Sequence, residues 1–152
     1  MSSMQAGVEA VEKSVVVHCD QRRAFEVFTR EIGSWWPLHT HSIGEDKVTE
    51  VVFEEKVGGR VFERHDDGAE GEWGRVLAWE PPARFVMSWY PGRDASEATE
   101  LEVRFTPAGD GTRVDLEHRG WEILAARARD ARAGYDTGWD EVLAYYTRRL
   151  GG

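Results

Sequence analysis

Short runs in which apolar and polar residues alternate fill the middle of the chain. In the clearest runs, Leu101, Val103 and Phe105, and later Val114 and Leu116, occupy every second position. A period of two puts successive side chains on opposite faces of a β-strand. Clusters of glycine, proline and aspartate separate the runs at short intervals, which is typical of an antiparallel meander. The pattern predicts seven strands, over residues 11–17, 48–54, 60–65, 72–79, 84–90, 100–105 and 113–118.

Two other stretches follow helical spacing. Asp20 is a suitable N-cap, and the apolar residues after it fall on one side of a helix that ends at Gly33. Near the end of the chain, over residues 125–150, one apolar helical stripe is formed by Trp139, Val142, Leu143, Tyr146 and Leu150. Because glycine is unfavourable inside a helix, the region from Gly134 to Gly138 predicts a bend or an interruption of this last helix.

The order of these elements predicts an α+β fold. A curved antiparallel sheet of seven strands would wrap around the long C-terminal helix, with two short helices after the first strand. Residues 11–150 would form one domain, and residues 1–10 would be disordered or loosely attached. Strand parity puts Phe85, Met87 and Trp89 on one face of a strand, and on one face of the preceding strand it puts Trp73, Arg75, Leu77 and Trp79. Large aromatic side chains on the concave face predict an apolar cavity under the helix.

Composition and charge narrow the class of protein. A length of 152 residues suits one domain, and a net charge of −9 argues against a nucleic-acid partner, because phosphate binding needs clustered Lys and Arg. Residues 45–72 hold ten acidic and four basic side chains, which is typical of a solvated sheet face. No apolar run is long enough for a membrane span, and the first ten residues lack the features of a signal peptide. Since Cys19 is the single cysteine, we expect no internal disulfide and no multi-cysteine metal site, and with the lack of a span and a signal peptide this predicts a cytoplasmic location. No glycine-rich phosphate-binding loop is present, and we expect no cofactor.

A series of spaced motifs runs from the second predicted strand to the last helix. It comprises Glu54–Arg60 (EEKVGGR), Asp67-Gly68, Trp73–Val76 (WGRV), Trp79–Phe85 (WEPPARF), Ser88-Trp89, Gly111–Val114 (GTRV), Leu116–Trp121 (LEHRGW) and Gly138-Trp139. This series resembles the activator of heat-shock-protein-90 ATPase homologue family, within the START-like, SRPBCC or Bet v allergen-like superfamily. The resemblance spans nearly the whole chain and implies the helix-grip fold, with a hydrophobic ligand cavity between sheet and helix. The superfamily includes lipid carriers, polyketide cyclases and aromatases, hormone receptors and co-chaperone domains, so the resemblance leaves the activity open.

We expect ten side chains, most of them aromatic, to contact a ligand in this cavity. Indole rings supply apolar area together with an N–H donor at the wall. The loop over residues 35–42 and the long helix would control access. The ten residues are Trp35, Trp36, Phe53, Glu63, His65, Trp73, Trp89, His118, Tyr135 and Trp139. For each aromatic residue, packing in an ordinary core is the alternative interpretation.

Glu63, His65 and His118 are the candidate acid–base groups. Parity with Val61 would aim Glu63 and His65 inward, and His118 continues the apolar face of the last strand. Grouped in one cavity, a carboxylate and two imidazoles could orient a polar ligand or move protons. The alternative is that Glu63 pairs with an arginine such as Arg75 and that the histidines are hydrogen-bonded core or rim residues.

A metal site is not predicted. His39 and His41 lie two positions apart in an expected loop, but two imidazoles need a third ligand before they form a site.

Three functions fit these observations. The first is non-enzymatic binding of a small apolar or amphipathic ligand, with an anionic or hydroxylated end. The second is an enzyme of the cyclase, aromatase or dehydratase type that uses Glu63, His65 or His118 as acid or base. The third is a protein-interaction or co-chaperone domain, for which Phe62 and Trp121 would be the exposed apolar residues. A homodimer is compatible with all three.

Overall fold

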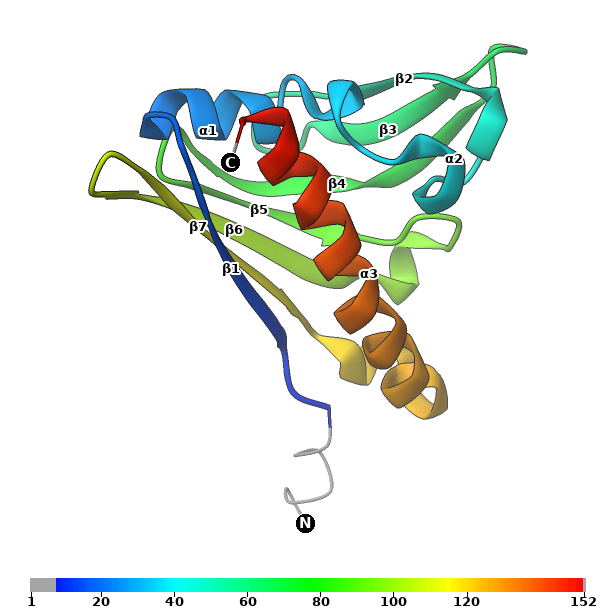
Figure 1. Ribbon diagram of the computed structural model, residues 1–152. Coiled ribbons are helices and arrows are strands. Elements are labelled where there is room, and N and C mark those ends of the chain that lie inside the picture. The colour runs from blue at the N-terminus through cyan, green and yellow to red at the C-terminus, as the bar shows by residue number, and fades with distance from the viewer. Residues whose placement is uncertain (1–7, 152) are drawn as a thin grey trace.

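The fold is an antiparallel sheet that curls around one long helix (Figure 1). The computed structural model describes residues 8–151. The strands are β1 (Val11–Val17), β2 (Val48–Phe53), β3 (Arg60–His65), β4 (Glu70–Glu80), β5 (Arg84–Trp89), β6 (Thr99–Ala108) and β7 (Gly111–Arg119). The helices are α1 (Gln21–Phe28), α2 (Leu38–His41) and α3 (Ala128–Arg149), with shorter helical turns at Ile32–Ser34, Glu45–Lys47, Ala95–Glu97 and Trp121–Arg127. The predicted α+β helix-grip fold is confirmed.

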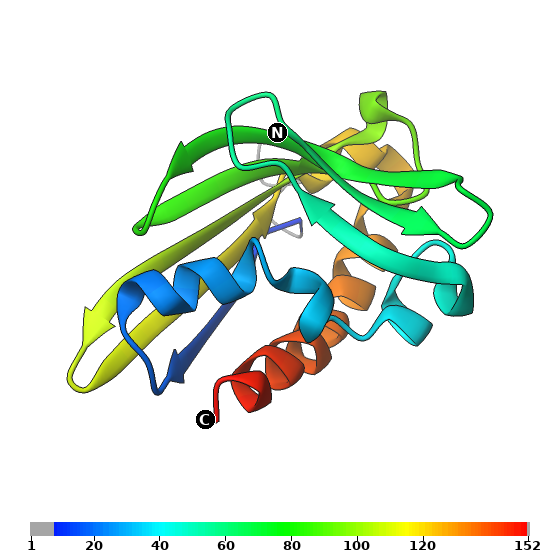
Figure 2. The same cartoon turned by 90° about the horizontal axis from the view of Figure 1, so that it is seen from above.

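The strand order places the two ends of the meander at the two edges of the sheet. The order is β1-β7-β6-β5-β4-β3-β2, and every neighbouring pair is antiparallel. Seen from above, α3 crosses the concave side (Figure 2). The register pairs Trp89 with Thr99 and Leu101 with His118, and all four side chains are buried. This brings the ends of β5, β6 and β7 together beneath the first half of α3.

Strand β4 departs from simple alternation at two β-bulges. The register shifts once where β4 pairs with β3 and once where it pairs with β5. Trp73 and Val76 are buried, whereas Arg75 is exposed and Leu77 is 47% exposed. The prediction that Arg75 and Leu77 share a face with Trp73 is therefore wrong, because each bulge adds one residue and reverses the parity of the strand.

The helices begin and end for identifiable reasons. As predicted, Asp20 caps α1, and its carboxylate accepts a hydrogen bond from the Arg23 backbone N–H at 2.8 Å. The predicted C-terminal helix is divided at Ala125, whose backbone has a φ of 51° and a ψ of −119°. From there α3 runs without interruption through Gly134 and Gly138, so the break lies nine residues before the predicted glycine region.

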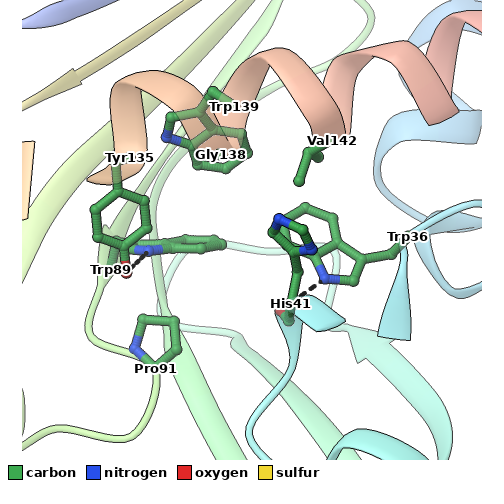
Figure 3. A pocket seen from close by; sticks show the side chains of 8 residues that line it. All are labelled: Trp36, His41, Trp89, Pro91, Tyr135, Gly138, Trp139 and Val142. Carbon is green, nitrogen blue, oxygen red and sulfur yellow. Dashed lines mark hydrogen bonds between the residues drawn. The ribbon is translucent and has the colours of Figure 1, made fainter. Parts of the chain in front are cut away.

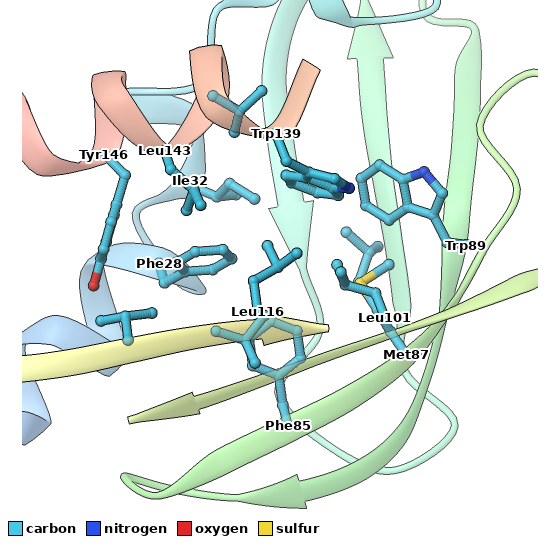
Figure 4. Packing of buried hydrophobic residues seen from close by; sticks show 14 of the residues in the cluster. Phe28, Ile32, Phe85, Met87, Trp89, Leu101, Leu116, Trp139, Leu143 and Tyr146 are labelled. Atoms are coloured by element: carbon cyan, nitrogen blue, oxygen red, sulfur yellow. The ribbon is translucent and has the colours of Figure 1, made fainter. Parts of the chain in front are cut away.

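The core lies between the concave face and the apolar stripe of α3. Figure 4 shows Trp139, Leu143 and Tyr146 of the helix facing Phe85 and other side chains of the sheet. The predicted helical stripe is confirmed, with Trp139, Val142, Leu143 and Tyr146 buried and Leu150 packed beside them.

Two residues expected at the surface are buried instead. Trp121 is fully buried, and its indole N–H donates to the His118 carbonyl at 3.0 Å. Phe62 lies on the other face of the sheet, where the Arg60 guanidinium stacks over its ring at 4.1 Å. The prediction that Phe62 and Trp121 form an exposed interaction surface is wrong, because an arginine covers one ring and the 121–127 turn folds the other into the core.

Part of the expected loose N-terminus, residues 1–7, lies outside the described residues. The carbonyls of Glu9 and Ala10 accept hydrogen bonds from the Arg132 guanidinium on α3, at 2.5 and 3.1 Å. Within residues 8–151, no helix has the length and apolar character needed to cross a membrane.

Candidate functional site

An aromatic pocket opens between α3 and the ends of the strands (Figure 3). Its volume is about 180 Å³. This is smaller than the roughly 300–1,000 Å³ of pockets that hold drug-sized ligands, so it suits a compact group such as one or two fused rings. The lining residues are Trp36, His41, Trp89, Pro91, Tyr135, Gly138, Trp139 and Val142.

Three indole rings form most of the wall. The ring centroids of Trp89 and Trp139 are 5.3 Å apart, those of Trp36 and Trp139 5.8 Å, and those of Trp36 and Trp89 6.1 Å. The planes of Trp36 and Trp139 are nearly perpendicular, at 81°. Rings at such angles expose both edges and faces, and both suit contact with an aromatic ligand.

Two polar side chains reach this apolar wall. The Tyr135 hydroxyl accepts a hydrogen bond from the Trp89 indole N–H at 3.0 Å, which leaves its own O–H able to donate. Nδ1 of the His41 imidazole is hydrogen-bonded to the Thr40 hydroxyl at 2.7 Å. Nε2 of the same ring lies 3.6 Å from the Glu141 carboxylate. Tyr135 and His41 therefore offer the pocket a hydroxyl and an imidazole.

The pocket opens outward past two glycines of α3. A second hollow, of about 420 Å³, shares His41, Tyr135 and Gly138 with the pocket and is also lined by Gly134 and Glu141. A Cβ atom placed on Gly134 or Gly138 would meet nothing within 4 Å. Neither glycine has a positive φ, so the backbone does not require them; what they provide is the space that a side chain would fill.

His118 lies behind the aromatic wall and is fully hydrogen-bonded. Its Nδ1 accepts from the Trp139 indole N–H at 3.0 Å, and its Nε2 is 2.7 Å from the Thr99 hydroxyl. Because that hydroxyl donates to the Trp89 carbonyl, the bonding pattern assigns the imidazole proton to Nε2. Burial, together with the positive charge of Arg93, lowers the pKa of His118 to about 3, so the ring is neutral at ordinary pH.

Glu63 belongs to a different network, on the far side of Trp73. Its carboxylate is fully buried and accepts hydrogen bonds from the Trp73 indole, the Ile43 and Gly44 backbone and the His65 imidazole. Burial alone would raise the pKa of Glu63, but these hydrogen bonds outweigh it and hold the pKa below its usual value. The Glu63–Arg75 pair that the sequence left open does not form; Arg75 pairs with Glu72.

The structure brings four of the ten predicted residues to the pocket: Trp36, Trp89, Tyr135 and Trp139. The other six lie outside its lining. Trp35 packs on Phe28 and Tyr146, Phe53 packs on Trp79 and Phe85, and Trp73 lies behind Trp36 and Trp89. The three acid–base candidates, Glu63, His65 and His118, are split between two networks and do not meet in one open cavity.

Sequence reasoning missed four lining residues: His41, Pro91, Gly138 and Val142. Helical spacing could have identified two of them, because Gly138 and Val142 lie three and seven positions after Tyr135 and so share its face of α3. His41 was considered as a metal ligand and as part of the 35–42 access loop, but not as a ligand contact. Among residues 8–151, no three His, Cys, Asp or Glu side chains are grouped so that they could hold a metal ion.

Residues 18–148 match the family described as "Activator of Hsp90 ATPase homolog 1-like protein". The chain belongs to this family. No curated protein matches the sequence.

Solved structures of similar fold include a synthase and proteins with other descriptions. The anthrahydroquino-gamma-pyrone synthase Txn09, solved in complex, is 38% identical, with a TM-score of 0.58 over 84% of this chain and 87% of Txn09. CalU16 from Micromonospora echinospora is 20% identical, with a TM-score of 0.61 over 91% of this chain and 71% of CalU16. The Aha1 dimer from Colwellia psychrerythraea is 14% identical, with a TM-score of 0.68 over 93% of this chain and 95% of that one. These solved structures therefore share one fold although their descriptions differ.

Proposed function

We propose that this protein binds a small, planar, largely apolar molecule in the aromatic pocket. The observation that carries the proposal is the open pocket between three indoles and Gly138, which the side chains of the sheet and of α3 do not fill. In the binding mode we propose, the Tyr135 hydroxyl and the His41 imidazole contact polar atoms at the edge of the ligand.

Charge at the opening favours a hydroxylated ligand over an anionic one. The outer hollow is lined by the carboxylates of Asp130 and Glu141, and its lining contains neither Lys nor Arg. A carboxylate or phosphate leaving the pocket here would meet like charge, whereas a hydroxyl would find acceptors. The proposed ligand class is therefore a neutral phenol or polyphenol rather than an aromatic acid.

A matched pair of probes tests this proposal. We expect 2-naphthol to bind, and 2-naphthoate, which has the same ring system with an anionic end, to bind at least tenfold more weakly. In ¹H–¹⁵N spectra, the indole N–H signals of Trp89 and Trp139 should shift with 2-naphthol. The signal of Trp79, which packs on Phe25, Phe53 and Phe85 away from the pocket, should not. The proposal fails if neither probe binds, or if binding shifts the signals of another region instead.

A second candidate function is ring closure of a polyphenolic or polyketide substrate. The specific observation that favours it is the 38% identity to the synthase Txn09 over most of both chains. Glu63 and His118 have their hydrogen-bonding positions occupied, so Tyr135 and His41 are the groups we propose as acid and base. Under this function, Tyr135→Phe and His41→Gln would abolish turnover of a linear aromatic polyketide, measured by mass spectrometry, while 2-naphthol still binds.

The Colwellia relative is described as a dimer, and a homodimer is proposed here only as a state to be measured. Sedimentation velocity with and without 2-naphthol would determine it on the same samples.

A further inference from the structure

The carboxylate of Glu63 has a complete set of donors although it is fully buried. Oε1 accepts from the Ile43 backbone N–H at 2.8 Å and from the Trp73 indole at 2.7 Å. Oε2 accepts from the Gly44 backbone N–H at 2.6 Å and lies 2.6 Å from Nε2 of His65. A carboxylate with two donors on each oxygen is a fixed anion rather than a group free to exchange protons with a substrate.

Two of these donors belong to the segment that contributes His41 to the aromatic pocket. Residues 37–44, called here the 37–44 segment, contain α2, and no residue of α2 is buried. The indole of Trp36, the residue just before the segment, donates to the His41 carbonyl at 3.0 Å. At the end of the segment, the Glu63 carboxylate accepts from the Ile43 and Gly44 N–H groups. The contact between His41 and Glu141 links the segment to α3, but at 3.6 Å and partly in solvent such a pair contributes little.

A third donor connects Glu63 to the aromatic wall itself. The Trp73 ring packs at 4.9 Å from that of Trp36 and at 5.8 Å from that of Trp89, and both of these residues line the pocket. Glu63 therefore fixes both the segment beside the pocket and the indole that supports two of its walls.

The lack of a side chain at Gly44 allows the 37–44 segment to lie against His65. A Cβ atom on Gly44 would lie 2.5 Å from Nε2 and 2.7 Å from Cδ2 of His65. Its φ is −91°, so the backbone conformation does not require glycine. The absence of a side chain is what lets the segment approach the Glu63–His65 pair closely enough to bond.

We propose that Glu63 is a positioning residue for the aromatic pocket, which holds the 37–44 segment and Trp73 in the binding-competent arrangement. Its effect on ligand binding rests on the function proposed above, whereas its effect on the segment does not. It acts through Trp36, Trp73 and His41 and not by contact with the ligand.

The test compares Glu63→Gln with Glu72→Gln in the full chain. Glu72 is a matched control, because it is a carboxylate on β4 that accepts from Tyr90 and Arg75 instead of from the segment. In Glu63→Gln, the side-chain N–H₂ group would face N–H donors and could not accept their hydrogen bonds. We therefore expect backbone hydrogen exchange at residues 38–44 to become at least tenfold faster in the ligand-free protein. Exchange in β5–β7 should stay within twofold, and the Trp73 indole N–H signal should move toward that of a weaker hydrogen bond.

The second variant is Gly44→Ala, which leaves Glu63 intact and should produce the same exchange pattern. It also carries the test if Glu63→Gln does not fold. In both variants, we expect 2-naphthol to dissociate at least tenfold faster, and in Glu72→Gln to dissociate as in the wild type. A purely structural role would speed exchange in all strands alike and leave the dissociation rate unchanged, and either result overturns the proposal. If 2-naphthol does not bind the wild type, the proposed function fails, and the exchange data still decide the role of Glu63.

Discussion

The indole N–H of Trp139 on α3 donates a 3.0 Å hydrogen bond to Nδ1 of His118 on β7. This bond joins the long helix to the concave face of the sheet directly behind the pocket. It needs an unprotonated Nδ1, so the orientation of a pocket wall depends on the neutral form of one histidine.

We predict that this histidine makes stability fall in mildly acidic solution. The pKa of His118 is about 3 in the folded protein, against an ordinary value of 6.5, so below pH 6.5 the unfolded chain binds a proton that the folded chain does not. Stability is then fully present above pH 6.5 and decreases as the pH falls, by up to about 1.4 kcal/mol per pH unit. Urea unfolding between pH 4.5 and 7.5 measures this slope, and below pH 4.5 Glu63, whose pKa is also lowered, adds to it in the same direction.

The variant His118→Gln should flatten the slope between pH 4.5 and 6.5, whereas His39→Gln, at an exposed position of α2, should not. An equal slope in the wild type and in His118→Gln would contradict the prediction.

Gly138 should lower the stability of α3 while it keeps the pocket open. Since a Cβ atom there meets nothing within 4 Å, we expect Gly138→Ala to raise the free energy of unfolding by about 0.5–1 kcal/mol. The variant Gly138→Leu should also fold. It should weaken 2-naphthol binding at least tenfold, because the leucine side chain would enter the pocket. The control is Gly134→Leu, which lines only the outer hollow and should bind 2-naphthol as the wild type does. Unchanged binding by Gly138→Leu would place the ligand elsewhere.

The Tyr135 hydroxyl should stabilise the free protein as well as contact a ligand. In Tyr135→Phe, the Trp89 indole N–H, on a side chain that is 4% exposed, loses its acceptor. An unpaired buried donor costs about 1–3 kcal/mol, measurable by chemical denaturation. Tyr145→Phe, on the same helix at an exposed position, should change stability by less than about 0.5 kcal/mol. Equal effects at the two tyrosines would show that the Trp89–Tyr135 bond contributes nothing.

Phe62 and Trp121 should behave as core residues. We expect Phe62→Ala and Trp121→Ala each to lower the free energy of unfolding by about 3–5 kcal/mol, because both rings are buried. Leu77→Ala, at an exposed apolar position, should cost less than about 0.5 kcal/mol. Near-wild-type stability of Phe62→Ala or Trp121→Ala would restore the hypothesis of an exposed interaction surface.

The fold could be predicted from sequence because most of its elements are regular. Alternation gave β3 its bounds and aimed Val114, Leu116 and His118 inward, and helical spacing identified the buried stripe of α3. Periodicity failed where the backbone is irregular. The residues of β4 contain no signal for its bulges. The positive φ of Ala125, between the buried Leu124 and the buried Ala128, is likewise not signalled by an alanine.

The site was less predictable because it depends on contacts between distant elements. Tyr135 and Trp139 follow from helix geometry, but the place of His41 depends on how the 37–44 segment is tied to Glu63. Gly138 was interpreted as a helix breaker, since sequence alone does not say whether the space beside a glycine is open or filled. His118 carried the right chemistry for a proton donor or acceptor, and only its partners, Trp139 and Thr99, show that both nitrogens are engaged.

The two bulges of β4 also bear on how the chain can change length. Each bulge reverses the inside–outside order of the strand, and together they cancel, so that Trp73 and Trp79 both pack inward. Loss of the extra residue at one bulge would remove a position and a reversal together, and Trp79 would still face Phe53 and Phe85. Loss of a residue with both bulges retained would turn Trp79 away from them. In descendants of this chain, one-residue deletions in β4 would therefore survive where they remove a bulge and would be eliminated where both bulges persist.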